Sequence, residues 1–280
     1  MTRAEQVLPF TLPDLPEAAD HAIAGKAIVP AVELLDLVVH KVEPAEAALP
    51  LVMRDAAFPR FLSAEEVRRC EFTLALEEAD ADHGIRASLA SRIPLASGMY
   101  RTRVHLAVTL GGAAPAAPEP PQSTACELEV AAERVYSDVV RFGPRFRNLR
   151  GSLRLGPDGA VGTVASPSPP HPHPSRAGCP FLLDSAMHLA CLWGQRYAGY
   201  VAYPTGFSSR IITVPLACGQ RRCRVVPRKV EARRLDCDLW LHDDAGRVCD
   251  VILGLAMAPL RTGAPPPSWI VHPQAAFRTP

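Results

Sequence analysis

The chain has 280 residues, of which 48% are hydrophobic, and its formal net charge is +1. This length and composition allow a core for one large domain or two small ones. A charge so close to neutral argues against a nucleic-acid-binding surface as the main function. No apolar run reaches the roughly 18 residues that cross a bilayer, and the N-terminus lacks a signal-peptide pattern. We therefore expect a cytoplasmic protein with no membrane partner.

The N-terminal half is predicted to span residues 1–111 and to contain one helix and several strands. His21 is followed by Gly25 four residues later and by Pro30 five residues after that. We expect an extended segment, a turn and the first residue of a helix at these positions, because proline suits the start of a helix. Apolar residues then recur at helical spacing to residue 42. Alternating apolar residues predict strands at 67–76, 84–93 and 100–110.

Residues 112–123 are rich in proline and alanine, so we interpret them as a semi-rigid linker between two halves. The C-terminal half is predicted to span residues 124–262, and residues 263–280 form a tail. Strands are predicted in this half at residues 126–130, 149–155, 160–164, 222–230, 235–241 and 248–258.

The helix expected from Pro180 is apolar nearly all round, which is typical of a helix that is buried on every side. Each half therefore consists of one buried helix and a run of antiparallel strands, which is an α+β organisation and suggests a tandem duplication. A sheet wrapped around a single helix is an economical way to bury both.

Asp184 lies on this helix among apolar residues, and a buried carboxylate without a partner is costly. His188 is four residues later and shares its helical face. A structural Asp–His pair is one interpretation, and an acid used in catalysis is the other. Since a buried carboxyl tends to hold its proton longer than an exposed one, burial suits the second role. His21 could take a proton near neutral pH or could simply be a packed histidine.

Three motifs occur in this order: His21-x-x-x-Gly25-x-x-x-x-Pro30, Phe142-Gly143-Pro144-x-Phe146 and Leu183-Asp184-x-x-x-His188. Their order and spacing resemble those of polyketide synthase dehydratase domains, and the resemblance extends from about residue 8 to about residue 260. It implies a double hot-dog fold, with two antiparallel sheets that each wrap around one buried central helix.

The resemblance also implies a reaction, the removal of water from a β-hydroxyacyl thioester on an acyl carrier protein. His21 would abstract the α-proton and Asp184 would protonate the departing hydroxyl, with no cofactor or metal. The carrier is the implied partner, and other synthase domains and a homodimer are left open. Substrate contacts are expected from Gly25, Pro30, Phe142, Gly143, Pro144, Phe146 and His188. The chain departs from the family at Phe142, where tyrosine is common, and at Cys179, where histidine is common.

Other functions stay open on the sequence alone. The same acid and base could shift a double bond or close a ring by oxa-conjugate addition. A non-catalytic acyl-binding module and a thioesterase-like hydrolase are further alternatives on this fold. His171 and His173 are expected to lie in a solvated loop without a metal. A group of arginines could dock an acidic carrier or form a solvated strand surface, at positions 221, 222, 224, 228, 233 and 234.

Overall fold

The computed structural model describes residues 5–42, 49–79, 84–95, 98–113, 115–121, 125–169, 171, 176–215, 218–261 and 265–272. The first part of the chain forms β1 (Glu5–Phe10), the 3₁₀ helix η1 (Pro16–Asp20), β2 (Ala22–Ile23), β3 (Lys26–Val29), α1 (Ala31–Val42), β4 (Leu51–Ala57), β5 (Leu62–Ser63), α2 (Ala64–Arg69), β6 (Glu71–Glu78), β7 (Ile85–Pro94) and β8 (Tyr100–Leu110). The second part forms β9 (Leu128–Ala131), α3 (Ala132–Asp138), the 3₁₀ helix η2 (Pro144–Phe146), β10 (Leu149–Gly156), β11 (Gly159–Ala165), α4 (Pro180–Tyr197), β12 (Ala202–Ile212), β13 (Gln220–Glu231), β14 (Arg234–His242) and β15 (Val248–Pro259).

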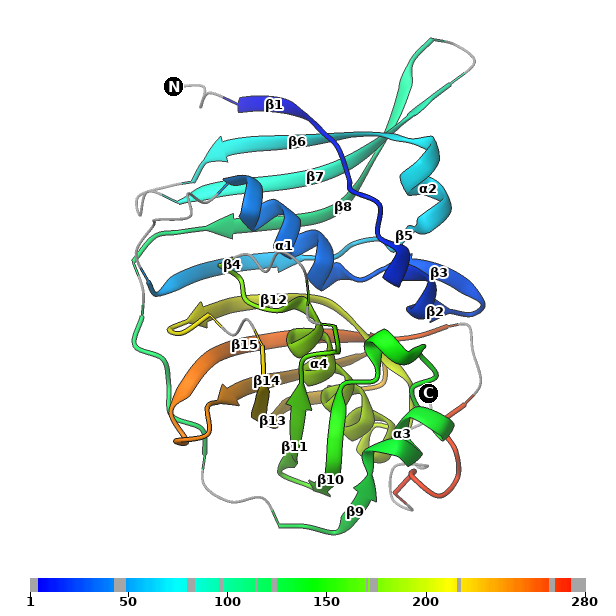
Figure 1. Ribbon diagram of the computed structural model, residues 1–280, viewed down its shortest axis with the longest axis vertical. Coiled ribbons are helices and arrows are strands. Elements are labelled where there is room, and N and C mark those ends of the chain that lie inside the picture. Colours follow the sequence, from blue (N-terminus) through cyan, green and yellow to red (C-terminus); the bar gives the residue numbers. More distant parts are fainter. Residues whose placement is uncertain are drawn as a thin grey trace.

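One antiparallel sheet of 12 strands runs through the whole molecule, in the order β1-β6-β7-β8-β4-β12-β15-β14-β13-β11-β10-β9. Figure 1 shows this sheet passing α1 in its first part and curling around α4 in its second. The predicted pair of separate sheets is therefore wrong. The two halves join where β4 pairs with β12, with Met53 opposite Arg210. Pairing these two strands removes two sheet edges whose backbone groups would otherwise lack partners.

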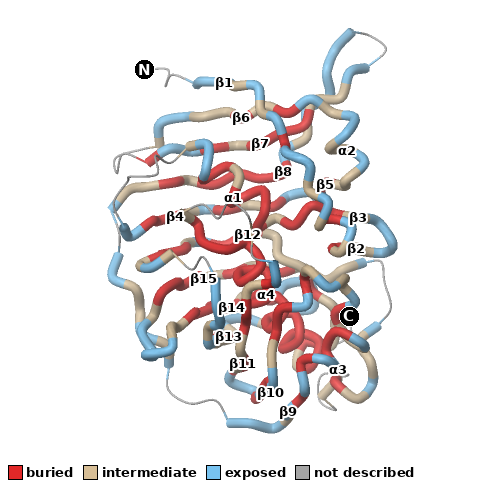
Figure 2. The backbone as a smooth tube through the Cα atoms, viewed as in Figure 1, coloured by how far each residue is buried: buried red, intermediate tan, exposed pale blue. Residues whose placement is uncertain are grey.

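The two central helices have the burial that their sequences predict. In α1 the fully buried side chains include Leu35 and Val38, whereas His40 near its end is exposed. In α4 every residue from Pro180 to Arg196 is buried, and Figure 2 shows the resulting continuous core. Pro180 is the first residue of α4 as predicted. Pro30 precedes α1 by one residue instead, and its carbonyl accepts hydrogen bonds from the first turn of the helix.

Two short helices are absent from the predicted elements. The strand predicted from residue 67 begins only at Glu71, because residues 64–69 form α2. A capping box at the start of α2 explains the helix, since Ser63 and Glu66 satisfy each other's backbone N–H groups. The other unpredicted helix is α3, which leads from β9 toward the Phe142–Phe146 motif.

The predicted linker has no helix or strand among its described residues. It nevertheless touches the C-terminal half, because Trp240 on β14 donates its indole N–H to the Pro118 carbonyl oxygen at 2.8 Å. The division of the chain into two halves, a linker and a tail stays a prediction. Among the described residues, no helix is both long and apolar enough to span a bilayer.

Candidate active site

A tight hairpin positions His21, which directly follows η1. Ala24 and Gly25 both have positive φ values, 50° and 76°, as a two-residue type I′ turn requires. This turn joins β2 to β3 and brings Ile28 back beside the histidine. The Ile28 N–H donates to the His21 carbonyl at 2.9 Å. Gly25 thus shapes the hairpin, and nothing lies within 4 Å of a Cβ placed on it, so the structure does not place it in contact with a pocket.

The same hairpin determines which nitrogen of His21 is basic. The imidazole Nδ1 lies 3.0 Å from the Ile28 carbonyl oxygen. Because a carbonyl can only accept, Nδ1 carries the proton and Nε2 holds the lone pair. His21 is 8% exposed, and burial lowers its pKa below the usual 6.5, although the charge of Asp184 partly opposes this effect. The ring is therefore neutral and able to accept a proton at neutral pH.

The Phe142–Phe146 motif packs directly on His21. The Phe142 ring stacks on the imidazole with centroids 4.3 Å apart, and the buried Phe146 ring lies 5.1 Å away. Pro144 begins η2, the short helix that carries Phe146. These contacts bring the Phe142–Phe146 motif and His21 together.

Asp20 holds this motif in place, and the sequence did not single it out. The Gly143 N–H donates to the Asp20 carbonyl at 2.6 Å, and the Arg145 N–H donates to Asp20 Oδ2 at 2.9 Å. A Cβ on Gly143 would lie 2.2 Å from Asp20 Oδ1, so only glycine fits there. The position of Asp20 directly before His21 is the one signal in the sequence that could have indicated it.

Asp184 and His188 form a close pair on the opposite side of the site. Asp184 Oδ2 lies 2.8 Å from His188 Nε2, and both side chains are almost fully buried. The ring N–H does not point directly at the carboxylate, so the two groups lie in close contact without an aligned hydrogen bond. Burial alone raises the pKa of Asp184, but His188 and His21 outweigh burial and hold the pKa below its usual value. The expectation that burial would keep the proton on Asp184 is therefore wrong for the free site.

Tyr136 on α3 contacts this pair through His188, and the sequence did not single it out. Its hydroxyl oxygen accepts the backbone N–H groups of Asn148 and Leu149, each at 2.9 Å. With both acceptor positions filled, the hydroxyl proton is directed to His188 Nδ1, 3.3 Å away. With Nδ1 as acceptor, His188 carries a proton on Nε2, toward Asp184. Tyr136 could not be found from apolar periodicity, because its short helix was not predicted.

The site therefore combines His21 from the N-terminal half with the Asp184–His188 pair from the C-terminal half. Phe142 lies between them, since its ring centroid is 4.3 Å from that of His21 and 5.1 Å from that of His188. Pro30 is buried at the junction of β3 and α1, where it ends the hairpin that holds His21. Cys179, which precedes α4, is buried, and its pKa is raised to about 11 by burial, so it packs as a neutral thiol.

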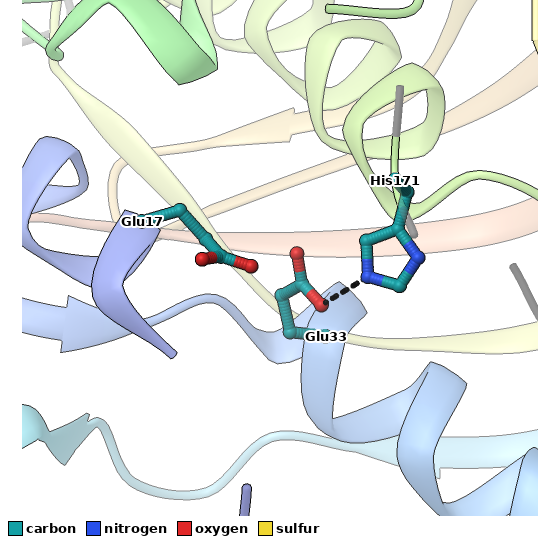
Figure 3. Close-up of side chains that lie close together, drawn as sticks. All are labelled: Glu17, Glu33 and His171. Carbon is teal, nitrogen blue, oxygen red and sulfur yellow. Dashed lines mark ion pairs between the residues drawn. The ribbon is translucent and has the colours of Figure 1, made fainter. Parts of the chain in front are cut away.

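One histidine outside this site contradicts the expectation of a solvated loop. His171 has a side chain that is only 10% exposed, and its Nε2 lies 3.5 Å from Glu33 Oε2 on α1 (Figure 3). His173 lies outside the described residues. The expectation failed because the partner of His171 is distant in the sequence.

Comparison with known proteins shows the family of this chain. The family model described as "Polyketide synthase dehydratase N-terminal domain" matches residues 114–267, more than half of the chain. The chain belongs to the polyketide synthase dehydratase family, whose reaction is the dehydration of β-hydroxyacyl thioesters in polyketide synthesis. It is 28% identical over 266 residues to the spectinabilin polyketide synthase system protein NorA' of Streptomyces orinoci. That match covers 91% of this chain but only 7% of the relative's length.

Solved dehydratase domains share the fold. The dehydratase domain from the CurJ module of the curacin polyketide synthase superimposes with a TM-score of 0.72 at 17% identity, covering 91% of each chain. A monomeric dehydratase domain from a trans-AT polyketide synthase split module superimposes with a TM-score of 0.71 at 14% identity. That match covers 93% of this chain and all of the other.

Proposed function

We propose that this chain dehydrates a β-hydroxyacyl thioester carried on the phosphopantetheine arm of an acyl carrier protein, with His21 as base and Asp184 as acid. The observation that carries this proposal is the Nδ1 contact of His21 with the Ile28 carbonyl, which leaves Nε2 as the basic nitrogen of a neutral imidazole. Among the similar solved structures is an inactive CurJ dehydratase variant in which a histidine is replaced by phenylalanine, which supports a catalytic histidine on this fold.

The proposed reaction needs one proton acceptor and one proton donor. His21 Nε2 takes the α-proton, and the electrons of that C–H bond form the new carbon–carbon double bond. The β-carbon–oxygen bond breaks, and the departing oxygen takes the proton of Asp184 and leaves as water. The site is left with protonated His21 and ionised Asp184, so return of that proton to the carboxylate completes the cycle.

The donor step requires Asp184 to be protonated, whereas His188 and His21 lower its pKa in the free site. A bound acyl chain excludes water, and exclusion of water raises the pKa of a carboxyl. We therefore assign proton uptake by Asp184 to substrate binding. His188, held by Tyr136, would keep the carboxylate oriented through Oδ2 and leave Oδ1 for the hydroxyl.

The remaining site residues would shape the pocket around these two groups. Phe142 and Phe146 offer apolar ring surfaces beside His21, while Gly143 and Pro144 set the backbone that carries them. Because the acid and the base are both side chains, the proposed reaction needs no cofactor. Cytoplasmic location and homodimerisation stay predictions.

Mass spectrometry of a 3-hydroxyacyl thioester incubated with the protein tests the proposal. The substrate is offered both on a carrier protein and as a pantetheine thioester, at several chain lengths. We expect a loss of one water with the native chain, and at least a thousandfold slower loss with His21→Asn and with Asp184→Asn. His40→Asn, a change at an exposed histidine of α1, is the matched control. An unchanged substrate at every chain length would contradict the dehydratase proposal.

Double-bond isomerisation is the second candidate, because a similar solved structure is described as an isomerase-inactive variant of the GphF dehydratase domain. Isomerisation removes a γ-proton, shifts the double bond and adds a proton at the α-carbon without loss of water, and one base can perform both transfers. A shift of the double bond at constant mass, detected by NMR in an α,β-unsaturated thioester, would favour this activity.

Carrier docking on the arginine group is a separate proposal about the partner. Arg228 and Arg234 are already paired with Asp238 and Asp236, so the proposal rests on Arg221 and Arg222, which are adjacent at the start of β13. Replacing both by glutamate should raise the KM for a carrier-bound substrate about fivefold and leave the KM for a pantetheine thioester unchanged. Equal effects on the two substrates would contradict docking there.

A further inference from the structure

A second group of polar side chains lies around the first turn of α1. Figure 3 shows the Glu33 carboxylate between Glu17 of η1 and His171, which lies ahead of α4 in the chain. Each residue offers one ligand atom, and the three atoms all lie within 4.8 Å of one another. Three separate segments, drawn from both halves of the chain, therefore place two carboxylates and one imidazole around a common point.

Glu33 is the buried member of this group and lacks part of its hydrogen bonding. It is 1% exposed, and among the described residues its Oε1 has no hydrogen-bond partner. Its Oε2 lies 3.5 Å from His171 Nε2, which is long for a hydrogen bond. A buried carboxylate oxygen without a donor is costly. Burial accordingly raises the pKa of Glu33, and its contact with His171 only partly opposes the effect.

We propose that Glu17, Glu33 and His171 bind a divalent first-row transition-metal ion, with zinc as the best fit. An imidazole nitrogen with two carboxylate oxygens is a donor set that suits zinc, whereas magnesium and calcium favour oxygen ligands alone. Two ligands of a tetrahedral zinc with bonds of about 2.1 Å lie about 3.4 Å apart. The 3.5 Å between His171 Nε2 and Glu33 Oε2 is close to that separation. Glu17, on a half-buried turn, completes the set by rotating its side chain inward.

The ion's place in the fold indicates a structural role beside the catalytic site. Glu17 and His21 lie four residues apart, and η1 ends directly before His21. On the other side, the His171 ring packs on Phe181, which packs on Phe146, and Phe146 contacts His21. An ion at this position would hold η1 against α1 and against the segment before α4, and thereby stabilise the position of the base.

Zinc titration of the chelator-treated full chain tests the proposal. We expect one zinc per chain at this site and a rise in melting temperature of about 5 °C at a hundredfold excess over Kd. Cobalt substituted for zinc should give the visible absorption of a site with nitrogen and oxygen ligands. Glu33→Gln and His171→Asn should each weaken binding about 100-fold and abolish the rise.

Matched variants separate this result from misfolding and from other metal sites. Metal-free Glu33→Gln should unfold at the same temperature as the metal-free native chain or higher, because the change removes a buried charge. Glu65→Gln and His40→Asn, at exposed positions, should keep the full zinc response. Equal zinc affinity in the native chain, Glu33→Gln and His171→Asn would overturn the proposal. So would loss of binding in His21→Asn with full retention in His171→Asn, because the ion would then lie in the catalytic site.

Discussion

The two central helices differ in where the partner of their buried carboxylate comes from. Each carries a buried carboxylate near its N-terminus, Glu33 on α1 and Asp184 on α4. The partner of Asp184 is His188, one turn later on the same helix, so helix geometry alone brings the two together. The partner of Glu33 is His171, which comes from the other half of the chain. A buried acid that is paired within its own helix is organised as soon as the helix forms, whereas the other acid depends on tertiary packing.

Removing the partner within α4 should give the largest effect. His188→Leu leaves the Asp184 carboxylate buried without its partner, and we expect a loss of about 4 kcal/mol in the free energy of unfolding. Urea unfolding measures this loss. The double variant Asp184→Asn/His188→Leu should recover a large part of it, because no buried charge is then left alone. A loss below about 1 kcal/mol in the single variant would show that the pair is not organised as described.

Removing the Tyr136 hydroxyl, which contacts His188, should have a smaller effect on stability at the same helix. Tyr136→Phe leaves the Asn148 and Leu149 N–H groups without their acceptor, and we expect a loss of about 2 kcal/mol. Dehydration should also slow about tenfold, since His188 loses its orienting donor. Tyr197→Phe, which removes a hydroxyl bonded to Glu127 at an exposed position, is the control for both measurements. An unchanged pH profile and rate in Tyr136→Phe would contradict the positioning role.

Disturbing the contact between Gly143 and Asp20, which lies next to His21, should lower the free energy of unfolding by a somewhat smaller amount. The Cβ of Gly143→Ala would meet Asp20 Oδ1 at 2.2 Å, and we expect a loss of about 1.5 kcal/mol as the loop shifts. The Phe142 ring would then move off the imidazole and dehydration would slow. Adding Asp20→Gly should relieve the clash, because the Asp20 Cβ itself would lie 2.7 Å from the new Cβ, so recovery of stability in the double variant is the check. No clash exists if Gly143→Ala is as stable as the native chain.

The pH dependence of the base should show the smallest effect. Burial lowers the pKa of His21 below 6.5, so the imidazole should be neutral near pH 7 and should gain its second proton only at a pH below 6.5. The contribution of His21 to folding stability changes with the same protonation step. It is fully present above the unfolded pKa of about 6.5 and is lost as pH falls from there through the folded value. NMR titration of the ring measures the pKa directly, and a midpoint above 6.5 would contradict the effect of burial.

The sequence predicted both central helices and most of the strands, because apolar periodicity records local burial. The motifs also indicated which side chains lie together, namely His21, Phe142, Phe146, Asp184 and His188, and their catalytic roles stay a proposal. The sequence did not predict β4 and β12, the two strands that join the halves into one sheet. Arg54 and Asp55 interrupt the first strand, and Pro204 and Gly206 interrupt the second. Both strands contain irregular pairing, which hides the alternation.

The residues that support the site were the least predictable. Asp20 acts through its backbone carbonyl and through one oxygen that accepts a distant N–H. Tyr136 acts through a hydroxyl that meets His188 from 52 positions away in the chain. Neither position stands out by periodicity or by a short motif, because such contacts arise only when the chain is folded.

The pairing of β4 with β12 has a consequence for how the protein can evolve. In an assembly of two identical chains, symmetry places every residue twice, so each substitution alters both sides of a shared site. Here the two halves are encoded separately within one sheet, and a mutation in one half is not copied into the other. One half could therefore keep a histidine and the other an aspartate at a single centre. The peptide backbone that joins them also keeps these unlike groups together at any protein concentration.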